Sequence, residues 1–430
     1  MRFARQSSYS STRCAATLVA AMVFVLTLAT AAFATTHEKT LYSFTGSPDA
    51  SPNGALVADA AGNLYGTTPS SGSGTVFELS PPATSGGAWT ETVLYAFQGG
   101  DTDGAYPYGT LIFDNAGNLY GTTSGGGPDN RGTVFELSPP ATSGGAWTET
   151  VLFFLPTNLF KGYSPAGRLA FDGEGNLYGM AQNGGIHFHT CDCGTLFELT
   201  PPAVSGGAWT PHVLHNFGLT TGDGANPVGD LTYWKGALYG MTAHGGTSGA
   251  GTIFQATRSH GTWTVSVLAS FDGINGSLPF GALALDAAGN AYGVAVNGGF
   301  AGTVYELSSP AVTGSGWQLS ALYAFTGAKD GANPSGPVVL DSAGNIYGTA
   351  RNGGLRNSQT NNNGTVFELS PPATSGGAWT ETTLHEFGGG VYNDGSQPNY
   401  GVVVVNGKLY GTTAAGGLNN VGTVFSLAVN

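Results

Sequence analysis

Most of the chain alternates short apolar runs with gaps rich in Gly and Ser. Residues 62–79 show the pattern, with the runs Gly62-Asn-Leu-Tyr-Gly-Thr-Thr68 and Gly74-Thr-Val-Phe-Glu-Leu79 separated by a short polar segment. Apolar side chains at alternate positions are typical of a strand with one buried face. Two such runs joined by a Gly-containing loop predict an antiparallel hairpin.

This hairpin recurs along the chain with a mean spacing of 58 residues. A third run, such as 89–97, follows every copy but the last, and a fourth, such as 109–114, precedes the hairpin. Each repeat therefore holds four short strands, named a to d in chain order. The second run of the hairpin begins at Gly74, Gly132, Gly194, Gly251, Gly302, Gly364 and Gly422, and the first run carries Tyr65, Tyr120, Tyr178, Tyr239, Tyr292, Tyr347 and Tyr410.

Repeats of this length with four strands predict an all-β, seven-bladed β-propeller with four antiparallel strands per blade. One blade cannot bury both of its faces alone, so neighbouring blades must stack around an axis. The last repeat ends after strand c, at 422–427, and a spare strand at 40–44 resembles the missing strand d. We expect this N-terminal strand to complete the last blade and close the ring. An open β-solenoid is the alternative, but it gives no reason for the displaced strand.

Residues 1–34 have the pattern of a signal peptide. Three basic residues, Arg2, Arg5 and Arg13, precede an apolar run that ends in Ala32-Phe33-Ala34. A basic segment, an apolar segment and a small-residue cleavage site predict export. An uncleaved membrane anchor is the alternative. Residues 35–430 are expected to form a single domain, secreted or periplasmic, monomeric, and without membrane contact after cleavage.

Composition and charge narrow the choice of partners. The chain has 430 residues, 71 of them Gly, 9% charged residues and a net charge of −13, which becomes −16 once the three arginines of the signal segment are removed. Nucleic acid is not expected as a partner, because phosphate binding requires clustered Lys and Arg. Metal cations or neutral saccharides suit such a surface better.

The repeated unit Leu-Tyr-Gly-Thr-Thr, followed by Gly-Gly and by Gly-Thr-Val-Phe-Glu-Leu, resembles the Gloeo/Verruco tandem repeat of exported bacterial proteins. The resemblance covers essentially the whole chain after residue 34. Repeat four departs most, with Tyr233-Trp-Lys-Gly236 in place of the Asp-x-Ala-Gly-Asn turn between strands a and b. The resemblance implies a propeller-like scaffold and an exported location, and it implies no particular activity or catalytic residue.

The loops between strands d and a carry the first candidate ligand-binding residues. Four of them begin with Asp-Gly, at Asp103, Asp223, Asp330 and Asp394. A ring of carboxylates would bind Ca²⁺ or a polyol. Turn chemistry, in which each Asp accepts backbone N–H bonds, is the favoured interpretation because most blades repeat it.

Aromatic residues in the same loops are the second candidates. Tyr106, Tyr108 and Tyr400 would stack on sugar rings if they are exposed. Packing between blades is the favoured alternative.

The third loop between strands b and c breaks the repeat pattern. It holds His187, His189, Cys191 and Cys193, and the corresponding loop of the next repeat holds His244. Imidazole and thiolate ligands on adjacent loops would bind Zn²⁺ or copper. A local disulfide between the two cysteines is the alternative, because an exported protein tends to oxidise its thiols.

No nucleophile, phosphate-binding or paired acid–base motif occurs, so we predict no catalytic residue. The leading hypothesis is a non-enzymatic exported binding or interaction scaffold for a saccharide or a protein partner. It would bind through the face that carries the d–a and b–c loops. The alternatives are a secreted hydrolase, lyase or lactonase with its site at the channel mouth, and a metal-binding protein that uses the loop at 187–193.

Overall fold

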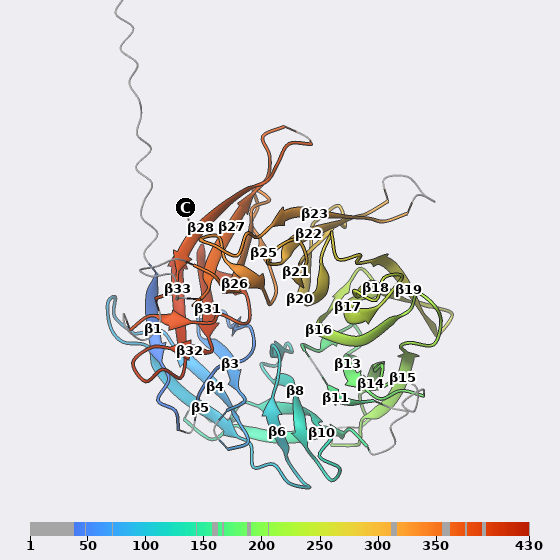
Figure 1. The fold of residues 1–430 in the computed structure, drawn as a ribbon. Coiled ribbons are helices and arrows are strands. Elements are labelled where there is room, and N and C mark those ends of the chain that lie inside the picture. The colour runs from blue at the N-terminus through green and yellow to red at the C-terminus, as the bar shows by residue number, and fades with distance from the viewer. Residues whose placement is uncertain are drawn as a thin grey trace, which may run out of the picture. The chain divides into compact units, whose positions relative to one another are not determined.

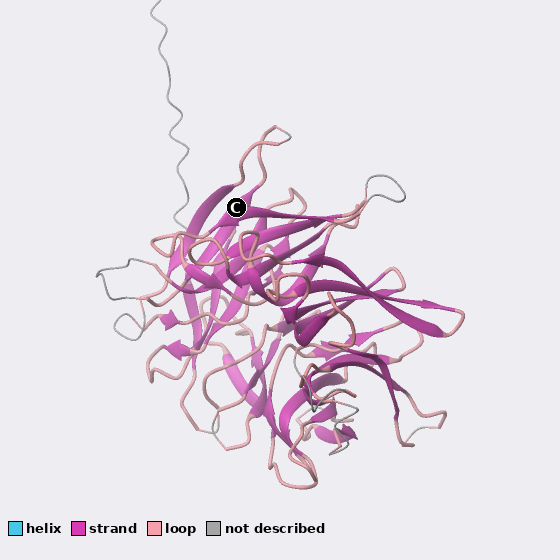
Figure 2. Cartoon of the chain, turned by 45° about the vertical axis from the view of Figure 1, so that its right-hand side comes forward, coloured by secondary structure: helices cyan, strands magenta, loops and turns pink. Residues whose placement is uncertain are grey.

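A computed structural model of the chain describes residues 38–429, except 48, 71, 143, 157–161, 166, 187–190, 205, 311–315, 355–361, 375 and 389–392. Seven antiparallel sheets lie around a common axis as the blades of a propeller (Figure 1). The described elements are all strands, joined by turns and loops (Figure 2). The predicted fold class is therefore confirmed. Within the described residues, no helix has the length and apolarity needed to cross a membrane.

Each blade runs from strand a near the axis to strand d at the rim, and strand a is split in two in several blades. Blade one contains β2 (Val57–Ala58), β3 (Leu64–Thr68), β4 (Thr75–Ser80) and β5 (Thr90–Ala96). Blade two contains β6 (Gly104–Pro107), β7 (Ile112–Phe113), β8 (Leu119–Gly126), β9 (Thr133–Ser138) and β10 (Thr148–Phe154). Blade three contains β11 (Tyr163–Pro165), β12 (Ala170–Phe171), β13 (Leu177–Asn183), β14 (Thr195–Thr200) and β15 (Thr210–Asn216). Blade four contains β16 (Gly224–Trp234), β17 (Ala237–Gly245), β18 (Thr252–Ser259) and β19 (Thr262–Ser270).

The remaining three blades follow the same order. Blade five contains β20 (Ser277–Leu285), β21 (Ala291–Asn297), β22 (Thr303–Ser308) and β23 (Gln318–Ala324). Blade six contains β24 (Ala332–Pro334), β25 (Val339–Leu340), β26 (Ile346–Asn352), β27 (Thr365–Ser370) and β28 (Thr380–Glu386). Blade seven contains β29 (Gly395–Ser396), β30 (Val402–Val405), β31 (Lys408–Thr413), β32 (Ala415–Gly416), β33 (Thr423–Ala428) and the N-terminal strand β1 (Lys39–Ser43).

The N-terminal strand closes the ring as the sequence predicts. β1 pairs antiparallel with β33, with Thr40 opposite Phe425, and the sheet has the order β1-β33-β31-β30. Phe44, just after β1, is fully buried and contacts Phe77 of blade one edge-on, with ring centroids 5.2 Å apart. The strand therefore completes blade seven and contributes to the packing of blade seven against blade one.

The repeated hairpin is explained by contacts within each blade. Gly66 stands opposite Phe77 in the ladder, and a Cβ at Gly66 would lie 2.6 Å from the end of the Phe77 ring. The Tyr65 hydroxyl donates to Asp59 at 3.1 Å, and the other carboxylate oxygen of Asp59 accepts the N–H of Asn63 at 2.9 Å. The Asp side chain thus holds the a–b turn by accepting hydrogen bonds from the backbone and from Tyr65.

A backbone hydrogen bond joins each blade to the one before it. The residue that precedes the strand-a proline has a left-handed backbone, and its N–H donates to a carbonyl in the b–c loop of the previous blade. Tyr106, for example, has φ of 60° and donates to Ser73 at 2.7 Å. Such a conformation costs free energy for a non-Gly residue, and here the contact between blades holds it in place. The seven residues are Ser51, Tyr106, Ser164, Asn226, Leu278, Asn333 and Gln397.

Candidate functional site: the mouth of the central channel

A ring of glycines lines the axis of the propeller. Each is the glycine of a Pro-x-Gly motif at the start of strand a, and its Cα lies against the backbone of the next blade. A Cβ on Gly109, for instance, would lie 2.7 Å from the carbonyl carbon of Gly167. Only glycine fits such an approach, and Gly109 also has φ of +95°. The ring consists of Gly54, Gly109, Gly167, Gly229, Gly281 and Gly336.

Blade seven breaks this ring with a tyrosine. It reads Gln397-Pro398-Asn399-Tyr400, so Tyr400 stands where the other six blades have glycine. Its side chain is 5% exposed. A large aromatic ring therefore fills the space beside the axis.

A cavity of about 480 Å³ opens above this ring. Its lining comes from blades one, two, five, six and seven, and side chains from so many blades can meet only around the axis. A smaller adjoining cavity of about 210 Å³ shares Tyr108 and Phe280 with it and brings in blades three and four. The lining of the larger cavity consists of Asn53, Tyr108, Phe280, Val296, Asn333, Ser335, Arg351, Asn352, Asn399 and Tyr400.

Three aromatic rings form one side of the cavity. The rings of Tyr108 and Tyr400 meet edge to face with centroids 6.0 Å apart, and those of Phe280 and Tyr400 with centroids 5.8 Å apart. Tyr108 and Phe280 are half-buried, so part of each ring surface faces the cavity. Such rings offer apolar surface to the face of a flat or cyclic ligand.

Amide, hydroxyl and guanidinium groups form the other side. Asn352 donates to the Asn333 side chain at 2.9 Å, and Asn333 donates to the Val296 carbonyl at 3.2 Å. The buried polar atoms of the lining that have no hydrogen-bond partner among the described residues include Ser335 Oγ and Asn399 Oδ1. Since buried polar groups are nearly always paired, these two atoms are suited to bind a polar ligand.

One carboxylate, that of Asp230, lies near the three aromatic rings but does not line the larger cavity. Asp230 is 3% exposed and accepts a hydrogen bond from the Thr110 hydroxyl at 3.0 Å and from the Arg168 N–H at 2.7 Å. Burial raises the pKa of Tyr400 well above its usual value, and the neighbouring Tyr108 and Asp230 raise it further. Tyr400 is therefore a neutral hydrogen-bonding group at any physiological pH.

The four aspartates of the d–a loops lie in four separate turns, each within its own blade. Asp103 is 6% exposed and accepts the N–H groups of Gln98 and Gly104, both at 2.6 Å, and the Tyr95 hydroxyl at 3.1 Å. Asp223 and Asp330 hold their turns with similar backbone bonds, and so does Asp394. These contacts follow the turn-chemistry interpretation, and none of the four aspartates lines the cavity.

The structure separates the three candidate tyrosines. Tyr108 and Tyr400 come together at the channel mouth, whereas Tyr106 is 49% exposed and does not line the cavity. Tyr400 is 5% exposed and packs against rings of blades two and five, which matches the interpretation of packing between blades.

The candidate metal loop is described only in part. His187 and His189 lie outside the described residues, and Cys191 and Cys193 form a disulfide that packs on Gly218. His244 is exposed on β17. Neither sulfur is a thiolate in this form, so metal binding by the loop as first envisaged requires reduction of the disulfide.

Sequence reasoning missed most of the cavity. Four of its residues, Asn53, Phe280, Ser335 and Asn399, occupy the variable position of Pro-x-Gly, as Tyr108 does. The signal was present, because this position changes from blade to blade inside an otherwise shared motif. Apart from the aromatic residues, the side chains at this position are ordinary loop residues, and the sequence alone does not mark them as neighbours.

Comparison with known proteins supports the repeat and the fold. A family model described as the Gloeobacter/Verrucomicrobia repeat matches residues 8–189, 90–305 and 300–430. A search of curated proteins finds no match to the chain.

Several solved structures are similar to this chain at low sequence identity. A polysaccharide lyase described as an ulvan lyase, solved with a bound saccharide, is 10% identical, with a TM-score of 0.51 and coverage of 92% of this chain and 96% of that one. An aldose sugar dehydrogenase from Streptomyces coelicolor, in a PQQ-bound form, is 15% identical, with a TM-score of 0.47 and coverage of 92% and 98%. A putative 6-phosphogluconolactonase from Bacteroides uniformis is 13% identical, with a TM-score of 0.45 and coverage of 77% and 83%. These similarities concern the fold alone.

Proposed function

We propose that this chain, which belongs to the Gloeobacter/Verrucomicrobia repeat family, is an exported binding protein that takes a short saccharide segment into the mouth of its central channel. The cavity carries the proposal. It places aromatic rings opposite amide and hydroxyl groups, and its volume of about 480 Å³ suits a small ligand.

The two sides of the cavity match the two surfaces of a sugar ring. The C–H face of a pyranose packs on an aromatic ring, and its hydroxyl groups both donate and accept hydrogen bonds. Tyr108 and Phe280 supply the rings, while Ser335 and Asn399 supply polar atoms without protein partners among the described residues. The side chain of Arg351 would favour a saccharide that carries a carboxylate or sulfate group.

The described lining favours binding over turnover. Of the ten described residues around the larger cavity, none is Asp, Glu or His, the groups that most often transfer protons. Asp230 lies close by, but its carboxylate is engaged by Thr110 and Arg168. The residues that face a ligand thus offer stacking and hydrogen bonding.

The test is a binding screen of residues 35–430 against neutral, uronic-acid and sulfated polysaccharides, followed by calorimetry with oligosaccharides of the best binder. Tyr108→Ala should weaken binding about tenfold, because an aromatic contact of this size contributes on the order of 1.5 kcal/mol or more. Ser335→Ala should weaken binding and leave the fold intact, since it removes a buried hydroxyl without a described partner.

Tyr106→Ala is the matched control. This tyrosine lies two residues before Tyr108 in the same segment, yet it is exposed and outside the cavity. Its replacement should leave affinity unchanged. Equal losses for both tyrosines would contradict the channel-mouth site, and release of new sugar ends during the screen would favour the lyase or hydrolase alternative. Binding of a protein partner with no saccharide bound would also overturn the proposal.

A further inference from the structure

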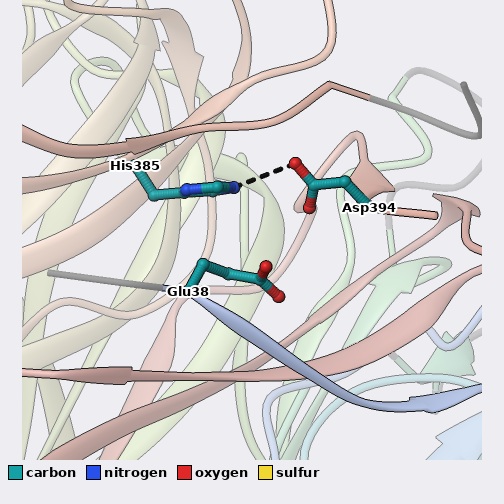
Figure 3. Close-up of side chains that lie close together, drawn as sticks. All are labelled: Glu38, His385 and Asp394. Carbon is teal, nitrogen blue, oxygen red and sulfur yellow. Dashed lines mark hydrogen bonds and ion pairs between the residues drawn. The ribbon is translucent and has the colours of Figure 1, made fainter. Parts of the chain in front are cut away.

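Three potential metal ligands converge where the two ends of the chain meet. His385 lies on β28 of blade six, Asp394 lies in the turn that leads to blade seven, and Glu38 immediately precedes β1. One ligand atom from each side chain lies within 4.8 Å of the other two. Figure 3 shows the imidazole of His385 directed at the Asp394 carboxylate, with the Glu38 carboxylate beside both.

The three groups are held on a packed support. His385 Nε2 lies 3.1 Å from Asp394 Oδ2, and the two side chains are 11% and 5% exposed. Asp394 also accepts the N–H groups of Gly388 at 2.8 Å and Gly395 at 2.7 Å, which fix its carboxylate. The His385 ring packs edge-on against Phe387, with centroids 4.8 Å apart. His385 and Asp394 are therefore held in place by their own blade junction, and the third ligand, Glu38, is supplied by the residue before strand β1.

The repeat shows what is particular about this junction. At the junction of blades one and two, the same three positions hold Tyr95, Asp103 and Glu149, and the Tyr95 hydroxyl donates to Asp103 at 3.1 Å. The junction of blades five and six repeats this arrangement with another tyrosine. Where these junctions have a phenol, the junction of blades six and seven has an imidazole, which is a far better ligand for a transition metal at neutral pH.

We infer that Glu38, His385 and Asp394 form a site for a divalent transition-metal ion of the Zn²⁺ class, which ties the N-terminal strand to blade six. One imidazole and two carboxylates suit Zn²⁺ with a fourth position for water, whereas Ca²⁺ requires more oxygen ligands. With bond lengths of about 2.0–2.2 Å, ligand atoms in a tetrahedral Zn²⁺ site lie about 3.3–3.6 Å apart. The His385–Asp394 pair is already 3.1 Å apart, so the Glu38 carboxylate has to approach it by roughly 1 Å when the ion binds.

The ion would also balance charge. Two carboxylates with one imidazole carry a net negative charge in a site that is partly removed from water, and a divalent cation neutralises it. Because the ligands come from both ends of the chain, metal binding would stabilise the closed ring, and this stabilisation would grow with the logarithm of the free ion concentration once the site is mostly occupied.

The test uses residues 35–430 with the Cys191–Cys193 disulfide formed, stripped of metal with a chelator. Zn²⁺ titration by calorimetry and thermal melts with and without ZnCl₂ are compared for the parent and its variants. The parent should bind Zn²⁺ and melt at a higher temperature in its presence. His385→Tyr should bind one equivalent less and still fold, since it restores the residue found at this position in blades one and five. Glu38→Gln should weaken binding by at least about tenfold.

His215→Tyr is the matched control. His215 pairs with Asp223 at 3.1 Å in blade three, but Val265 occupies the position that corresponds to Glu38. This variant should bind as much Zn²⁺ as the parent. The inference is overturned if the parent binds no Zn²⁺, if His385→Tyr binds as much as the parent, or if Ca²⁺ replaces Zn²⁺ with equal affinity.

Discussion

The ring of Tyr400 in blade seven meets the ring of Tyr108 in blade two edge to face, with centroids 6.0 Å apart and an angle of 82° between the planes. The contact depends on a single exception to the glycine ring. Had blade seven kept glycine at this position, the rings of Tyr108 and Phe280 would lack the ring that both of them contact. Tyr400, which replaces glycine in one repeat only, thus adds an aromatic ring to the lining of the cavity at the axis.

Replacing Tyr400 with glycine tests this relationship. We expect Tyr400→Gly to lower the free energy of unfolding by about 3 kcal/mol, because it removes a buried aromatic side chain. It should also abolish saccharide binding. Chemical denaturation and calorimetry measure the two effects. Tyr106→Gly is the control, since an exposed residue with a left-handed backbone should lose nothing in stability when it becomes glycine. A stable Tyr400→Gly variant that binds normally would contradict this role of Tyr400.

Asp103 should matter for stability and not for binding. Asp103→Ala removes acceptors for two backbone N–H groups and the Tyr95 hydroxyl, and it should cost about 3 kcal/mol. Saccharide affinity of the folded variant should equal that of the parent. Asp101→Ala, at an exposed neighbouring position, should change neither quantity. Loss of binding in a folded Asp103→Ala protein would instead support the carboxylate ring.

Stability should fall as pH rises from about 4.5 to about 7. Burial, together with the nearby Asp103, raises the pKa of Glu149 to about 7, and burial likewise raises the pKa values of Glu91 and Glu381 to about 7. Because these folded-state pKa values exceed the unfolded one, the folded state binds more protons in that range, and stability decreases with rising pH. Thermal melts across the range measure the slope.

Glu149→Gln supplies the check on this pH dependence. It removes a carboxylate that burial disfavours, so the variant should be more stable than the parent at pH 8 and closer to it at pH 5. The slope between these values should decrease. An identical slope in parent and variant would show that Glu149 does not titrate in this range.

Closure by β1 can be tested by moving the strand. Deletion of residues 35–44 should prevent cooperative unfolding, because it exposes the edge of β33 and removes the fully buried Phe44. A circular permutant that places 35–47 after Asn430, joined by the sequence of 80–88, should fold, since it restores the strand order of the other blades. Circular dichroism and thermal melts distinguish the outcomes. A deleted protein that melts like the parent would contradict closure by β1.

The contacts within each hairpin could be predicted from the sequence because the same residues recur in successive repeats. The pairing of Gly66 with Phe77 and the bond of Tyr65 to Asp59 recur in most blades, so the motif itself predicts the hairpin and its turn. Only part of the candidate site could be predicted from the sequence. Tyr108 and Tyr400 were singled out for their aromatic rings, but Asn399 and Ser335 are ordinary loop residues until the ring closes.

The sequence by itself determined the number of blades, the strand order and the closure by the first strand, because these depend on contacts within one repeat and between neighbours. Only the tertiary structure decided which variable side chains share a cavity and which charged groups share a junction. Tyr108 meets Tyr400, and Glu38 meets His385 and Asp394, across long stretches of sequence. Closing the ring brings these positions together at the axis or at the junction of two blades. No local sequence pattern shows which distant residues will meet there.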